Sequence, residues 1–197
     1  MPAPAADSVR AFIAITLAPA QMAHLQELQR ELRSRLTGHG IRWVRPDQLH
    51  LTLRFLGNVD RERLADLSVA LHQACAGAAP FPLAFEGVGC FPDTGQPRVI
   101  WAGLRGELDS LQRIQARVRQ GTQSFGDHQE ERAFRPHLTI GRVEKGGRES
   151  REVRRQIESV RASTLEPWTV RQIHLIQSQL TSAGPRYTAL TSIAIGD

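Results

Sequence analysis

The run RPDQLHLTLRFLG at residues 45–57 has a shorter copy, RPHLTIGR, at residues 135–142. Both copies are β-prone runs in which a histidine is followed two places later by a threonine. Because successive side chains of a strand point to opposite faces, His50 and Thr52 share one face, while Leu51 between them points into a core. Each copy therefore predicts a strand that presents one imidazole and one hydroxyl group together.

The elements around the two copies repeat as well. Each half of the chain reads as strand, helix, His-x-Thr strand, helix and strand, which indicates a duplicated unit. Hydrophobic periodicity and turn residues place further strands at 9–17, 41–44, 81–91, 98–104, 168–180 and 187–195, and helices at 19–36, between Asp60 and Gly77, at 107–120 and at 149–160. Asp60 is the expected N-cap of the second helix.

A duplicated unit pairs naturally about a pseudo-twofold axis. We therefore expect the two His-x-Thr strands to face one another across a groove. This arrangement brings His50 and Thr52 to the same cleft as His137 and Thr139, although the two pairs are far apart in the sequence.

The composition is that of an ordinary globular protein, with 197 residues, of which 41% are hydrophobic and 23% charged. We expect a single domain over residues 9–195, made of two pseudo-symmetric lobes, and a flexible tail over residues 1–8. No apolar run approaches membrane-spanning length, and the first residues lack the basic and apolar regions of a signal peptide. The expectation is a cytoplasmic protein, monomeric and without a membrane partner.

The basic residues favour a polyanionic partner. The net charge is +5, and Lys145 is the only lysine among 25 basic residues. Arginine forks match phosphate oxygens in pairs, so this charge fits nucleic acid, although a basic composition by itself is a weak indication.

The chemistry follows from the two histidines. Two imidazoles can act near neutral pH as a general acid and a general base, and neighbouring hydroxyl groups can bind the oxygens of a phosphate. Neither an activated serine or cysteine nor a phosphate-binding glycine loop is evident, and Cys75 and Cys90 lack the spacing of a zinc site. The sequence indicates phosphodiester chemistry without a metal or cofactor.

Other residues are weaker candidates for substrate contacts. By strict alternation Arg54 lies on the face of His50 and Thr52, whereas Arg142 is out of phase with His137 and ranks lower. Tyr187 follows a loop and is the aromatic residue best suited to stack on a base. His174 is expected to be a hydrogen-bonded core or cleft-edge residue rather than a third catalytic group.

These motifs resemble those of the two-histidine (2H) phosphoesterases, and most of all the bacterial and archaeal RNA 2′,3′-cyclic phosphodiesterases, first described as 2′-5′ RNA ligases. The resemblance covers residues 10–195. It rests on the paired HLT motifs, on WVRP at 43–46, on FLG at 55–57 and on the closing LTSAGPRY at 180–187.

The resemblance implies an α+β, bilobal, duplicated fold with two concave antiparallel sheets around a central cleft and helices outside. It also implies hydrolysis of RNA 2′,3′-cyclic phosphate ends to 2′-phosphates, with reversible, ATP-independent 2′-5′ joining of RNA such as tRNA halves as a related activity. Carried over by motif, His50 is the proton donor, His137 is the proton acceptor, and Thr52 and Thr139 are phosphate ligands.

Two alternatives stay open at this point. The same cleft suits a small cyclic nucleotide or an ADP-ribose cyclic phosphate, and the fold also suits a non-catalytic RNA-binding module. Intact histidines and threonines in both motifs argue against the second alternative.

Overall fold

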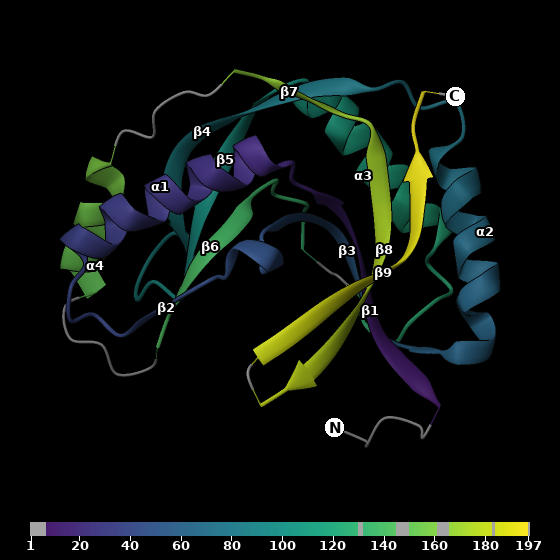
Figure 1. The fold of residues 1–197 in the computed structure, drawn as a ribbon, viewed down its shortest axis with the longest axis horizontal. Coiled ribbons are helices and arrows are strands. Elements are labelled where there is room, and N and C mark those ends of the chain that lie inside the picture. Colours follow the sequence, from purple (N-terminus) through teal and green to yellow (C-terminus); the bar gives the residue numbers. More distant parts are fainter. Residues whose placement is uncertain (1–6, 130–131, 145–149, 161–165, 183, 197) are drawn as a thin grey trace.

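The computed structural model describes residues 7–129, 132–144, 150–160, 166–182 and 184–196 (Figure 1). Its helices are α1 (Pro19–Arg35), α2 (Leu64–Cys75), α3 (Leu108–Gly121) and α4 (Ser150–Ser159), with short 3-10 turns at Pro46–Gln48 and Arg61–Arg63. Its strands are β1 (Ser8–Thr16), β2 (Ile41–Trp43), β3 (His50–Asp60), β4 (Phe81–Phe91), β5 (Val99–Gly106), β6 (Leu138–Val143), β7 (Trp168–Val170), β8 (Gln172–Thr181) and β9 (Gly184–Ala194). The expected order of elements in both halves is confirmed.

The strands form one curled antiparallel sheet in the order β7-β4-β5-β6-β3-β1-β8-β9, with β2 paired to β6 (Figure 1). Its two lobes meet between β6 and β3, where a single residue pair, Leu51 with Leu138, joins them. The expected α+β fold with helices outside is confirmed. The sheets of the two lobes are joined into one, so the two His-x-Thr motifs lie on neighbouring strands.

The helices of the described residues cover the outside of the sheet, with α1 and α4 on one lobe and α2 and α3 on the other (Figure 1). Helices α1 and α4 pack on the lobe of β4, β5 and β6, while α2 and α3 pack on the lobe of β1, β3, β8 and β9. Each lobe is therefore covered by one helix from each half of the sequence.

Apolar stripes at helical spacing explain why the helices pack in this way. Leu25, Leu28 and Leu32 of α1 are buried, and so are Leu111, Ile114 and Val118 of α3. Burying each such side chain contributes roughly 1.5–3 kcal/mol relative to leaving it exposed. These stripes join the outer face of the sheet in one hydrophobic core.

Several boundaries differ from the sequence expectations. The strand expected at 168–180 is divided at Arg171, because β7 pairs with β4 in one lobe and β8 pairs with β1 in the other. Asp60 makes no capping hydrogen bond, and the 3-10 turn separates it from α2. Of the expected tail, Ser8 belongs to β1, while residues 1–6 lie outside the described residues.

No helix in the described parts of the chain is both long enough and apolar enough to cross a membrane.

Candidate active site

The site lies where β3 and β6 meet. Leu51 and Leu138 are directly paired. Antiparallel geometry relates the residues on either side of this pair, of which His137 lies just before β6. It sets two pairs side by side on the inner face: His50 opposite Thr139, and Thr52 opposite His137. Directly opposed side chains of antiparallel strands share a face. The four side chains therefore form a rectangle with the histidines on one diagonal and the threonines on the other.

The two imidazole rings are oriented in the same way by the main chain. Nδ1 of His50 lies 2.7 Å from the carbonyl oxygen of Gln48, and Nδ1 of His137 lies 2.6 Å from that of Arg135. A carbonyl oxygen only accepts, so each Nδ1 carries its proton. Nε2 of each ring is left for the cleft, where it can accept or donate a proton.

Aromatic side chains pack against both rings. Tyr187 of β9 meets His50 edge to face at 5.4 Å, and Phe12 of β1 lies 4.7 Å from the same ring. Phe91, at the end of β4, meets His137 edge to face at 5.0 Å. The tyrosine expected at the site is thus in contact with His50, whereas no sequence pattern singled out Phe12.

Burial decides the charge of the two histidines. Burial is the largest cause that lowers the pKa of both rings, and the bonds to the carbonyl oxygens offset it only in part. The positive charge of Arg142 contributes to the lowering in both rings and His137 contributes to it in His50, whose pKa falls to about 4. Both imidazoles are therefore neutral at pH 7 in the unliganded site, and they are close enough to influence one another.

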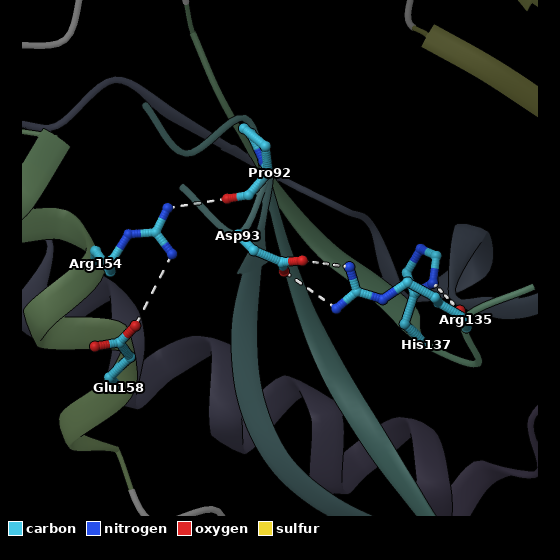
Figure 2. A network of polar contacts seen from close by, with 6 residues as sticks. All are labelled: Pro92, Asp93, Arg135, His137, Arg154 and Glu158. Atoms are coloured by element: carbon cyan, nitrogen blue, oxygen red, sulfur yellow. Dashed lines mark hydrogen bonds and ion pairs between the residues drawn. The ribbon is translucent and has the colours of Figure 1, made fainter. Parts of the chain in front are cut away.

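A polar network fixes the segment that carries His137 (Figure 2). Arg135, whose carbonyl holds the imidazole, makes a two-pronged ion pair with Asp93 at 2.6 and 3.1 Å and lies over the ring of Phe91. Arg154 of α4 donates to the carbonyl oxygen of Pro92 at 2.9 Å. Helix α4 and the turn after β4 thereby position the second histidine.

A matching arrangement holds the segment before His50. Arg45 pairs with Asp47 at 2.5 Å, and this contact lowers the pKa of the Asp47 carboxyl group. The side chain of Gln48 donates to the carbonyl oxygen of Pro185 at 2.6 Å. That bond ties the start of β3 to the β8–β9 hairpin, which carries Tyr187.

A bulge in β3 puts Arg54 out of phase with His50, although Arg54 still lines the cavity beside the rectangle. Thr52 pairs with Ala14 and Arg54 pairs with Ile13, so Leu53 has no partner and the alternation is reset. Arg54 is 6% exposed and donates hydrogen bonds to the hydroxyl of Thr122 and the carbonyl of Phe125. The expectation that Arg54 lies on the face of His50 is wrong.

A bulge in β6 has the opposite effect on Arg142. Thr139 pairs with Trp101 and Gly141 pairs with Ile100, which leaves Ile140 unpaired. Arg142 therefore lies on the inner face, where its charge reaches both histidines. Strict alternation ranked this arginine too low, and Gly141 was the available signal, since a glycine inside a strand often marks a bulge.

A cavity of about 740 Å³ opens beside the rectangle, with Thr52 and His137 at one side. Phe55, which the β3 bulge places opposite Phe12, and Phe134 contribute aromatic surface to it. Gln123, near the end of α3, contributes an amide. Pockets of about 300–1,000 Å³ hold drug-sized ligands, so this cavity has room for a nucleoside.

The remaining candidates lie elsewhere. His174 is buried and hydrogen-bonded to Thr16 at 3.0 Å and to Ser192 at 2.9 Å, as expected for a structural histidine. Trp43, a candidate for base stacking in the WVRP motif, packs against the core and under Arg33. Among the described residues, no group of three or more His, Cys, Asp or Glu side chains is placed to hold a metal ion.

Comparison with known proteins identifies the family. The sequence model of the LigT-like phosphoesterases matches residues 15–101 and 104–187, which is most of the chain and includes both His-x-Thr motifs. The chain belongs to this family. In this LigT-like phosphoesterase, the two matched segments meet within β5, and each contains one of the motifs.

Two curated relatives support the assignment. An RNA 2′,3′-cyclic phosphodiesterase of Archaeoglobus fulgidus is 36% identical over 167 residues, 84% of this LigT-like phosphoesterase and 91% of the relative. One of Methanothermobacter thermautotrophicus is 31% identical over 180 residues, 91% of this chain and 95% of the relative.

Solved structures agree on the fold. The protein TT0787 of Thermus thermophilus is 30% identical, with a TM-score of 0.74 over 94% of this chain and 97% of that one. E. coli LigT complexed with 3′-AMP also has a TM-score of 0.74, over 97% of this chain and 100% of that one, at 24% identity. At that identity the likeness shows the fold alone.

Proposed function

We propose that this protein hydrolyses 2′,3′-cyclic phosphate ends of RNA to 2′-phosphates by metal-independent general acid-base catalysis. The observation that carries the proposal is the diagonal histidine pair, with both Nδ1 atoms engaged by carbonyl oxygens and both Nε2 atoms left for the cleft. The curated relatives named RNA 2′,3′-cyclic phosphodiesterase support the substrate.

In the proposed reaction the cyclic phosphate lies over the rectangle, and its terminal nucleoside occupies the adjacent cavity. Nε2 of His137 accepts a proton from water as the water oxygen forms a bond to phosphorus. The bond from phosphorus to the 3′ oxygen breaks, and that oxygen receives a proton from Nε2 of His50. The product carries a 2′-phosphate and a 3′-hydroxyl group.

In this proposal three side chains bind the phosphate oxygens. The hydroxyl groups of Thr52 and Thr139 lie on the other diagonal, and Arg142 adds positive charge from the same face. Donors fixed before the reaction stabilise the negative charge that develops at phosphorus. A bound phosphate also offsets the positive charge of Arg142. This offset favours protonation of His50, which acts as the acid.

Ligation uses the same groups with another nucleophile. If the 5′-hydroxyl of a second RNA replaces water, His137 accepts its proton and the product is a 2′-5′ diester with a free 3′-hydroxyl. The reverse step needs the two histidines to exchange roles. We propose this as a related activity of the same site.

The test is incubation of a short RNA ending in a 2′,3′-cyclic phosphate with the protein, in the presence of EDTA. Chromatography distinguishes a 2′-phosphate from a 3′-phosphate product. We expect the 2′-phosphate, and a roughly 10²- to 10⁴-fold lower rate for His50→Ala and for His137→Ala. Failure of the folded wild-type protein to open the ring would refute the proposal.

A further inference from the structure

A pair of arginines lies on the inner face beyond the rectangle. In the register of β2 and β6, Arg42 is directly opposite Arg142. The neighbours of Arg42, Ile41 and Trp43, pack against the hydrophobic core, so Arg42 points to the opposite side, toward the cleft. Two arginine residues are therefore paired on the cleft face.

This pair is unfavourable for folding. Like charges directly opposite one another on antiparallel strands destabilise a sheet. Neither Arg42 nor Arg142 belongs to an ion pair among the residues that the structure describes. Glu144, the next residue on that face, bonds through its backbone to Gly40 without joining such a pair. An anion bound between the two arginines would relieve the repulsion.

The pair continues the cleft of the candidate active site. The charge of Arg142 contributes, after burial, to the lowered pKa of His50 and of His137, so this guanidinium group is within electrostatic reach of the reacting phosphate. Arg42 lies on β2, which pairs with the same edge of β6 as β3 does, so it lies further along that edge, beyond His50. A ligand that places one phosphate over the histidines and a second phosphate further along this edge would engage both arginines.

We propose that Arg42 binds the 5′-phosphate of the nucleotide that carries the cyclic phosphate. This inference rests on the proposed function. In an RNA strand that 5′-phosphate is the backbone linkage to the preceding nucleotide, whereas a nucleoside 2′,3′-cyclic phosphate has none. Arg42 thus makes the site selective for RNA ends over small cyclic nucleosides.

Three substrates separate the contribution of the phosphate from that of a second base: a nucleoside 2′,3′-cyclic phosphate, the same compound with a 5′-phosphate, and a dinucleotide with a cyclic end. We expect kcat/KM of the wild type to rise about tenfold or more when the 5′-phosphate is added, as for a charge-assisted hydrogen bond. A further base should add less than the phosphate.

In the variant Arg42→Gln, kcat/KM for the nucleoside 2′,3′-cyclic phosphate should be nearly the same with and without the 5′-phosphate. For the dinucleotide, the slope of log(kcat/KM) against log(salt) should become shallower by about 0.7, the value for one contact to a single strand. The matched control is Arg30→Gln on the outer face of α1, which removes an exposed charge paired with Glu27 and should keep the wild-type gain from the 5′-phosphate.

A folding measurement completes the test. Because Arg42→Gln removes a like-charge contact, its melting temperature should equal or exceed that of the wild type. Three results would overturn the assignment of Arg42 while leaving the proposed function intact. The 5′-phosphate gives no gain in kcat/KM in the wild type, the gain is unchanged in Arg42→Gln, or it is lost equally in Arg30→Gln. If the wild type opens none of the three substrates, the proposed function itself fails.

Discussion

The two imidazoles start neutral, and this sets the pH dependence of catalysis. The proposed reaction needs one protonated and one neutral imidazole in the free enzyme. Burial is the main reason that both pKa values lie below the usual value of about 6.5, with that of His50 at about 4. The fraction of enzyme with one protonated imidazole therefore decreases as the pH rises above these pKa values. We expect kcat/KM for a cyclic phosphate to fall about tenfold per pH unit from about pH 7 to pH 9.

Ionisation of the substrate does not contribute to this pH dependence, because a cyclic phosphate is a diester whose charge is constant between pH 7 and pH 9. In Arg142→Met the falling limb should move to higher pH, since the charge of Arg142 lowers the pKa of both rings. A constant kcat/KM between pH 7 and pH 9 would contradict the prediction.

The acid and base roles can be separated with a second substrate. A phosphodiester whose leaving group is a nitrophenolate needs little protonation as the bond breaks. His50→Ala should therefore lose far less activity on it than the roughly 10²- to 10⁴-fold loss on the RNA end, whereas His137→Ala should lose activity on both. The opposite pattern would exchange the roles of His50 and His137.

One bulge in β3 and one in β6 determine which arginine shares the face of the two histidines. Arg54→Met removes hydrogen bonds to Thr122 and to the carbonyl of Phe125, and leaves buried acceptors without a partner. We expect the free energy of unfolding to fall by about 2 kcal/mol in urea titrations, with kcat/KM within about threefold of the wild type.

Arg142→Met provides the crossed comparison. Its side chain is exposed, so the free energy of unfolding should change by less than about 0.5 kcal/mol. Its kcat/KM should fall about 10- to 100-fold with the loss of a charge-assisted contact to phosphate. If instead Arg54→Met were inactive and stable, the orientation of both arginines would have to be reconsidered.

The same bulges mark the limit of sequence reasoning about elements. Hydrophobic periodicity placed the helices because their buried stripes recur every three or four residues, and it placed the strands because they are rich in β-formers. Whether an extra residue enters a strand depends on its partner, as Leu53 does opposite β1 and Ile140 opposite β5. Alternation from His50 or His137 therefore fails after three residues.

The whole molecule interlocks the two halves of the sequence. Strand β4 comes from the first half but pairs with β5 in the second lobe, while β8 and β9 return from the end of the chain to β1. The lobes are also covered by one helix from each half. Neither half of the sequence contains a complete lobe.

This interlocking predicts complementation. Cutting the chain in the exposed turn between β4 and β5 gives fragments 1–95 and 96–197. Neither fragment alone should unfold cooperatively, because each exposes a core face that its partner covers, whereas an equimolar mixture should recover a cooperative transition. Thermal circular dichroism of each fragment and of the mixture checks this. Cooperative melting of 1–95 alone would show that the first half is an independent unit.

The candidate catalytic pair and the class of fold could both be predicted from the sequence. In each His-x-Thr motif the two-residue period of a strand places the histidine and the threonine on the same face. The repeat of whole elements indicated that the two motifs would meet. Only the tertiary structure decided which groups surround that pair. The bulges, the single pairing of Leu51 with Leu138, and the contacts of Phe12 and Arg142 depend on neighbouring strands that are distant in the chain, and local sequence patterns carry no information about such contacts.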